Sequence, residues 1–126
     1  MAVRQYAQVV GVVIILIGVV GLLLGDQSLG GLLNIDIAED IIHLVTGGLM
    51  AYVGFFRQDS GLLRSVVGGL GVVYLLVGVL GFIVPGLFGL LPSEYSVVDN
   101  LIHLTLGVLG IAVAWLLKGD DRSATA

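Results

Sequence analysis

The sequence predicts an all-α membrane protein, a polytopic transmembrane four-helix bundle built from two pseudo-symmetric helical hairpins in parallel orientation. The first observation is composition: of 126 residues, 58% are hydrophobic and 11% are charged, and the mean hydropathy is +1.15. A soluble domain carries about 25% charged residues. The second observation is a set of four long apolar stretches, and the third is an internal repeat that relates the two halves of the chain.

Each apolar stretch is long enough to cross about 30 Å of hydrocarbon as a helix. The four expected spans are residues 5–24, 37–57, 62–84 and 97–117. Glycine, proline and charged residues mark the expected loops, at 25–36, 57–61 and 85–96. Residues 1–118 then form a single transmembrane domain with an uncleaved first span, followed by a flexible cytoplasmic tail at 119–126.

The charged residues predict the orientation of the spans. With four spans, all five basic residues fall on one side of the membrane: Arg4, Arg57, Arg64, Lys118 and Arg122. The other side carries acidic residues and no basic ones: Asp26, Asp36, Glu39, Asp40, Glu94 and Asp99. The basic side is cytoplasmic by the positive-inside rule. We therefore expect a multi-pass protein of the cell (inner or plasma) membrane with both termini in the cytoplasm.

The repeat superposes the first half of the chain on the second without a gap. GVVIILIGVVG from Gly11 matches GVVYLLVGVLG from Gly71, and EDIIHLVTG from Glu39 matches DNLIHLTLG from Asp99. Repeat one covers about residues 2–57, and repeat two covers about 62–117. Each repeat holds two spans, so both copies have the same orientation, and a pseudo-twofold axis along the membrane normal should relate them.

Glycines line one face of the first and third spans. Transmembrane helices associate through close packing, which small residues permit. We therefore interpret these faces as packing surfaces of the bundle, with a substrate groove as the alternative. The glycines concerned are Gly11, Gly18, Gly21 and Gly25 in the first span, and Gly71, Gly78 and Gly81 in the third.

The two histidines occupy equivalent positions, each one turn below a carboxylate near the start of its own span. Asp36 with Glu39, and Ser96 with Asp99, have the spacing of a helix capping box. At 1.5 Å per residue, both imidazoles lie roughly 10 Å below their helix starts, at a common depth. The simplest interpretation is a hydrogen-bond network that closes the outer end of the bundle without any cofactor, because an ionisable group at membrane depth needs a partner.

Three alternatives use the histidines functionally. A transition metal such as zinc could bind a mixed nitrogen and carboxylate site, if the pseudo-twofold axis brings its members together. Its candidate ligands are His43, His103, Glu39, Asp40 and Asp99. A haem could take His43 and His103 as axial ligands, although closely packed glycine faces leave little room for one. The third alternative is a path for protons or small solutes.

The remaining composition narrows the class of function. A net charge of −4 and a pI near 4.7 argue against nucleic acid as a partner, and the absence of cysteine removes disulfides and thiolate chemistry. The scattered serines and threonines form no nucleophile motif, so we do not expect an enzyme. The leading expectation is a structural or accessory component of the lipid bilayer, as a homo-oligomer or as a subunit of a larger membrane complex.

The pattern as a whole resembles an uncharacterised prokaryotic family of small four-span membrane proteins, known as a domain of unknown function. The pieces that carry the resemblance are GVVIILIGVVGLL, VVYLLVGVLG and the paired motifs DIIHLVTG and NLIHLTLG. The resemblance implies a four-helix integral membrane protein, and it supplies no substrate, cofactor or reaction. Asp40 stands where the second motif has Asn100, which would make any paired site asymmetric in charge.

Overall fold

Four long helices form the protein in the computed structural model, which describes residues 2–25, 27–29, 33–84 and 96–117. They are α1 (Ala2–Leu24), α2 (Ile37–Phe56), α3 (Ser60–Ile83) and α4 (Val97–Ile111), and α4 continues into a π-helical turn, η1 (Ala112–Leu116). Counting α4 with η1, all four are long and apolar enough to cross a membrane. The expected all-α class and its four spans are confirmed, and the chain has the helices of a multi-pass membrane protein.

A short β-ribbon interrupts the first long connection, which the sequence predicts as a loop. Strands β1 (Gln27–Leu29) and β2 (Leu33–Ile35) pair in antiparallel fashion, with Ser28 opposite Asn34. Strand pairing satisfies backbone N–H and C=O groups in a segment that is too short to cross the membrane. Residues 85–95 of the expected second outer loop (85–96) and the whole expected tail (119–126) lie outside the described residues.

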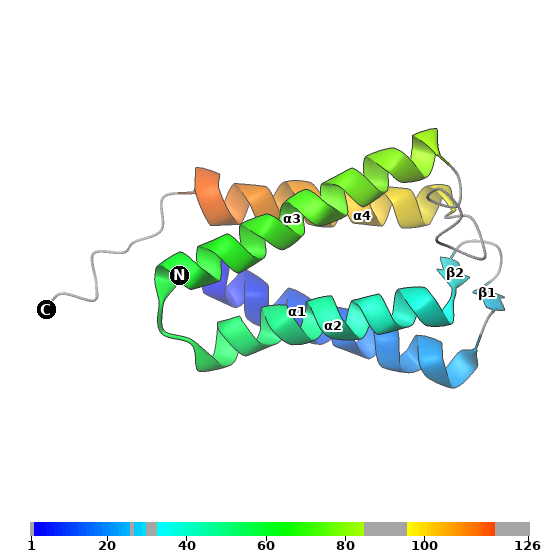
Figure 1. Cartoon of the computed structure of the whole chain (residues 1–126), viewed down its shortest axis with the longest axis horizontal. Helices are drawn as coiled ribbons and strands as arrows, with labels where there is room; N and C mark the ends of the chain where they lie inside the picture. Colours follow the sequence, from blue (N-terminus) through cyan, green and yellow to red (C-terminus); the bar gives the residue numbers. More distant parts are fainter. Residues whose placement is uncertain (1, 26, 30–32, 85–95, 118–126) are drawn as a thin grey trace, which may run out of the picture.

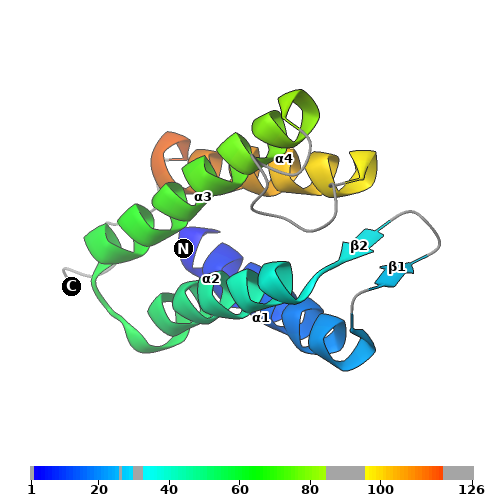
Figure 2. The ribbon, with the colours of Figure 1, turned by 45° about the vertical axis from the view of Figure 1, so that its right-hand side comes forward.

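Within each hairpin the glycine faces allow the two helices to touch backbone to backbone. A Cβ atom at Gly11 of α1 would lie 2.6 Å from the backbone nitrogen of Ala51 in α2. A Cβ atom at Gly71 of α3 would lie 2.9 Å from the backbone nitrogen of Ile111 in α4. The glycine faces are thus occupied inside the pairs α1/α2 and α3/α4, which run side by side in both ribbon views (Figures 1 and 2). Gly25 is the exception: it follows the end of α1 with a φ of 74°, and a Cβ atom there would meet nothing within 4 Å.

The two hairpins meet mainly at the end where α1 begins. Their ribbons converge there and diverge toward the end that carries β1 and β2 (Figure 1). An apolar core fills the closed end, because aliphatic side chains from all four helical segments pack together. Its buried members are Val3, Ala7, Met50, Val53, Leu63, Val67 and Ala114. The other end of the bundle is where polar side chains lie between the hairpins.

Candidate metal centre

Side-chain caps fix where α2 and α4 begin, and hence how deep their histidines lie. At α2, the Asp36 carboxylate accepts a hydrogen bond of 2.8 Å from the Ala38 backbone nitrogen. At α4, Ser96 and Asp99 form the expected capping box, with Asp99 Oδ2 accepting from the Ser96 backbone nitrogen at 3.1 Å. The second expected capping box does not form: Asp36 caps α2 alone, and the Glu39 side chain turns toward the imidazoles.

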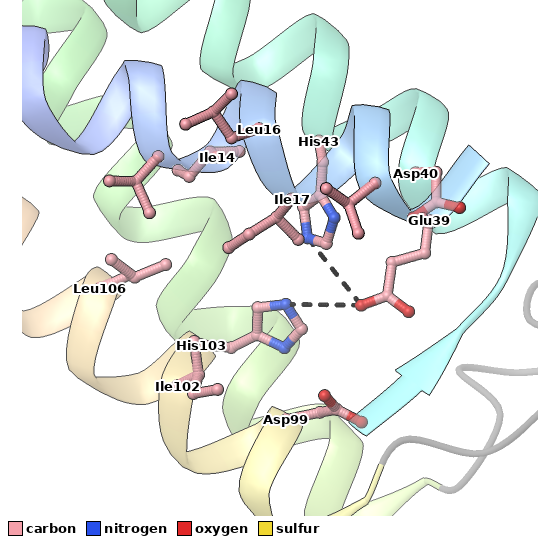
Figure 3. A pocket seen from close by; sticks show the side chains of 13 residues that line it. Ile14, Leu16, Ile17, Glu39, Asp40, His43, Asp99, Ile102, His103 and Leu106 are labelled. Carbon is pink, nitrogen blue, oxygen red and sulfur yellow. Dashed lines mark ion pairs between the residues drawn. The ribbon is translucent and has the colours of Figure 1, made fainter. Parts of the chain in front are cut away.

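Three of the predicted site residues meet between the hairpins. Glu39 Oε1 lies 3.9 Å from Nε2 of His43 and 3.9 Å from Nε2 of His103 (Figure 3). One ligand atom from each of the three side chains lies within 4.8 Å of the other two. Glu39 and His43 come from α2 and His103 comes from α4, so the cluster joins two segments that are 60 residues apart in the sequence.

Glu39 and His103 are buried and His43 is half-buried, and the carboxylate lies near both imidazoles without a direct hydrogen bond to either Nε2 atom. A separation of 3.9 Å is too long for a hydrogen bond. Among the described residues, the buried Nδ1 atom of His43 has no hydrogen-bond partner. Tyr74 of α3 stacks on the His103 ring at a centroid distance of 5.7 Å, which limits the orientations that this ring can adopt.

The other two predicted metal ligands are engaged elsewhere. The Asp40 carboxyl group packs against the α1 backbone at Gly21, and Asp99 serves the capping box of α4. Both side chains line the same cavity as the cluster, but neither belongs to the group of three whose ligand atoms converge. The set predicted from the sequence therefore divides into a central trio (Glu39, His43 and His103) and two peripheral carboxyl groups.

A cavity of about 360 Å³ adjoins the central trio (Figure 3). Its walls come from α1, α2 and α4, and most of them are apolar. The α1 wall is a contribution that sequence reasoning missed, because aliphatic residues spaced by three and four look the same whether they face lipid or a cavity. The apolar residues that line the cavity are Val13, Ile14, Leu16, Ile17, Val20, Ile102 and Leu106.

Two imidazole nitrogens and one carboxylate oxygen are a donor set that suits zinc. Tetrahedral coordination with bonds of about 2.0–2.1 Å separates the ligand atoms by about 3.3 Å. The observed 3.9 Å between Glu39 Oε1 and each Nε2 atom is within reach of a small side-chain rotation. Three protein ligands leave a fourth coordination position, which characterises sites that also bind a small ligand.

The same geometry argues against the other two uses of the histidines. The rings of His43 and His103 have centroids 6.4 Å apart, and Glu39 Oε1 lies close to both, in the space that a haem ring would have to occupy. A continuous path for protons or solutes would have to cross the apolar core at the closed end of the bundle. A single metal ion fits the cluster better than either alternative.

The fold and this site define a small membrane protein with four apolar helices and a largely buried cluster of two histidines and one glutamate. Residues 1–56, which hold α1, the β-ribbon and α2, match the family described as a domain of unknown function, DUF4383. The match confirms the resemblance over the first half of the chain, which holds the motifs GVVIILIGVVGLL and DIIHLVTG. No significant match to a curated protein or to a solved structure was found.

Proposed function

We propose that this protein is a metal-binding integral membrane protein that holds one transition-metal ion, in the first instance Zn²⁺, on Glu39, His43 and His103. The observation that carries the proposal is the convergence of their three ligand atoms within 4.8 Å, from two separate hairpins. The structural or accessory role expected from the sequence remains a prediction. It gains no direct support from the glycine faces, because Gly11, Gly18, Gly21, Gly71, Gly78 and Gly81 contact the other helix of their own hairpin.

Electrostatics supports an ion at this position. A carboxylate at membrane depth is unfavourable unless a positive charge or hydrogen-bond donors compensate it. The described basic side chains, Arg4, Arg57 and Arg64, belong to the opposite end of the bundle. A divalent cation coordinated by Glu39 and by two neutral imidazoles would supply the missing positive charge within the cluster.

We further propose that the two hairpins are pseudo-symmetric and parallel, with both termini cytoplasmic and the cluster toward the outer face of the cell membrane. Equivalent contacts support the symmetry: Asp40 packs against Gly21 as Asn100 packs against Gly81. A pseudo-twofold axis between the hairpins would bring the two histidines to one site. Glu39 then breaks the symmetry, because its counterpart Asp99 is held by the capping box.

The proposed role is binding, without a catalytic step. Among the residues that the structure describes, those that line the cavity include no serine, threonine, cysteine or lysine that could act as a nucleophile. The polar lining groups are the carboxyl and imidazole groups already described. They are suited to coordinating a cation and to orienting a ligand beside it.

Metal analysis of protein without a histidine tag, reconstituted in lipid nanodiscs, tests the proposal. We expect one Zn²⁺ or Co²⁺ per chain after exposure to metal and removal of excess. His43→Ala, His103→Ala and Glu39→Gln should each weaken binding by more than about 100-fold, because changes to outer-shell partners alone cost 10–100-fold. Asp36→Asn is the matched control, since asparagine still caps a helix while one carboxyl group at the same end is lost.

Two results would overturn the metal-binding role. One is wild-type protein that is folded by circular dichroism and yet binds no Zn²⁺ or Co²⁺ at micromolar concentration. The other is equal binding by the wild type and by the three ligand variants. Either result would leave the histidines as polar residues that close the bundle, and an optical spectrum of the same sample would show whether haem had been bound instead.

A further inference from the structure

We propose that the fourth coordination position of the metal takes the anionic oxygen head of a single-chain amphiphile, whose alkyl tail lies between α1 and α4. This inference rests on the proposed metal site and names the class of ligand that the site would take. The head is a carboxylate or a phosphate oxygen. The tail occupies the α1/α4 groove, which we define by six apolar residues of the cavity: Val13, Leu16, Ile17, Val20, Ile102 and Leu106.

The groove has the shape of a slot for a chain. Its α1 residues recur at intervals of three and four, so they form one stripe along the helix. From Val13 to Val20 this stripe extends for roughly 10 Å at 1.5 Å per residue. The α4 residues form the facing wall, one turn apart, and the central trio lies against the same cavity. A molecule with one apolar and one polar end fits this order of groups.

The groove is accessible from the side that faces the hydrocarbon of the membrane. Leu16 is 56% exposed and Ile17 is 49% exposed, although both line the cavity. Both belong to α1, a helix long and apolar enough to span the membrane, so lipid tails surround this opening. An amphiphile could therefore enter laterally, with its tail remaining in an apolar environment throughout.

The volume favours one tail over two. Pockets for small ligands range from about 300 to 1,000 Å³, and this cavity, at about 360 Å³, lies at the lower end. A diacyl lipid would leave its second tail outside the groove. A single-chain fatty acid or a lysophospholipid matches the space better.

Charge selects an anionic head. A divalent ion bound to Glu39 and two neutral imidazoles retains one positive charge, and an anionic fourth ligand makes the coordination shell neutral, which a low-dielectric site favours. Asp99 accepts hydrogen bonds from Ser96, and both Asp40 and Asp99 lie in the first turn of a helix. The positive ends of the α2 and α4 dipoles offset part of the charge on these two carboxylates.

Visible absorption of the Co²⁺-loaded protein in phosphatidylcholine nanodiscs tests this inference. Added myristate should shift the absorption bands of Co²⁺, and this shift should reach its maximum at one myristate per chain. Referred to the concentration in the aqueous phase, acetate should require at least about 100-fold more ligand than myristate, because each methylene moved from water into an apolar environment strengthens binding roughly fourfold. A stronger response to myristoyl lysophosphatidate than to myristate would identify a lipid phosphate as the head, and the reverse would identify a free carboxylate.

A pair of tryptophan variants distinguishes binding of the tail in the groove from binding of the metal. Ile17→Trp fills the groove and should abolish the response to myristate while one Co²⁺ per chain remains bound. Ile41→Trp is the matched control: Ile41 is similarly exposed, at 51%, but does not line the cavity, so the response should persist. Two results would overturn the proposal of an amphiphile while leaving the metal site intact. In one, the wild type binds Co²⁺ but responds to myristate and lysophosphatidate no more strongly than to acetate. In the other, the response of Ile17→Trp to myristate equals that of the wild type. Absence of Co²⁺ from the wild type would overturn the metal site itself.

Discussion

The carboxyl group of Asp40 in α2 packs directly onto the backbone of α1 at Gly21, where a Cβ atom would overlap its oxygen Oδ1. The amide group of Asn100 in α4 makes the equivalent contact with Gly81 in α3. Glycine at these two positions lets a polar side chain of the neighbouring helix lie against the helix backbone. This contact sets the spacing of each hairpin at the level of the central trio.

Replacing either glycine should therefore destabilise the protein. We expect Gly21→Ala and Gly81→Ala each to lower the free energy of unfolding by about 1–3 kcal/mol, because the added methyl group must displace the buried carboxyl group of Asp40 or the buried amide group of Asn100. Gly48→Ala is the control, since a Cβ atom there meets nothing within 4 Å. It should be neutral or slightly stabilising. Reversible unfolding in mixed micelles measures the difference, and equal stability of all three variants would contradict the packing described here.

Arg4 ties the start of α1 to the end of α2. Its Nη1 atom donates to the backbone oxygens of Gly54 and Arg57, at 2.9 and 2.8 Å. Charged donors near a helix C-terminus satisfy carbonyl groups that have no partner within the helix. We expect Arg4→Gln to lower the free energy of unfolding by about 1 kcal/mol in the same micelle assay. Arg57→Gln removes the same charge from an exposed side chain and should lower the free energy of unfolding by less. An equal or larger loss in Arg57→Gln would contradict a specific role of the two Arg4 hydrogen bonds.

Tyr74 links the two hairpins at mid-depth through a contact of 2.7 Å between its hydroxyl and Thr46 Oγ1. The Thr46 hydroxyl donates to the backbone oxygen of Ile42, so Tyr74 is the donor in this pair. Tyr74→Phe should lower stability by about 1 kcal/mol while the aromatic stacking on His103 remains. The control is Tyr52→Phe, at an exposed position, which should behave as wild type in thermal unfolding followed by circular dichroism.

The proposed orientation can be read from single cysteines, because the chain has none of its own. A membrane-impermeant maleimide should label Ser28→Cys in intact cells, since position 28 lies in the β-ribbon between the first two spans. Gln58→Cys, in the turn between α2 and α3, should react only after the membrane is permeabilised. Labelling in the opposite order would invert the topology and bring the metal site to the cytoplasmic side.

The sequence located the four helices well because their signal is local. Residues 37–57 and 97–117 were expected as spans, and the corresponding helical segments run from Ile37 to Phe56 and from Val97 to Leu116. The start of α4 also follows from a local pattern, because Ser96 and Asp99 form the expected capping box. At Asp36 the same spacing predicted a box that does not form, because Glu39 lies beside two imidazoles, one of which comes from a distant helix.

The candidate site could be predicted only in part. The number of residues between each helix start and its histidine predicts an equal depth for His43 and His103. The same pattern indicates three candidate partners: Glu39, Asp40 and Asp99. The sequence does not indicate which of these carboxyl groups lies closest to the imidazoles. Glu39 and Asp40 are consecutive on one helix, and which of the two directions faces the other hairpin depends on the fold. The fold distinguishes them: Asp40 meets Gly21, while Glu39 lies between the imidazoles.

Hydropathy and residue spacing alone identify a small membrane protein with four apolar helices, glycine-lined helix faces and two histidines at one depth. Hydropathy and periodicity are properties of neighbouring residues, so no knowledge of the fold is needed to find them. Three features emerge from the packing of the helices: the glycine faces pack inside each hairpin, Glu39 lies beside both histidines, and α1, α2 and α4 enclose a cavity. Each of these depends on how far helices distant in the sequence approach or diverge, and aliphatic side chains give the same signal in either case.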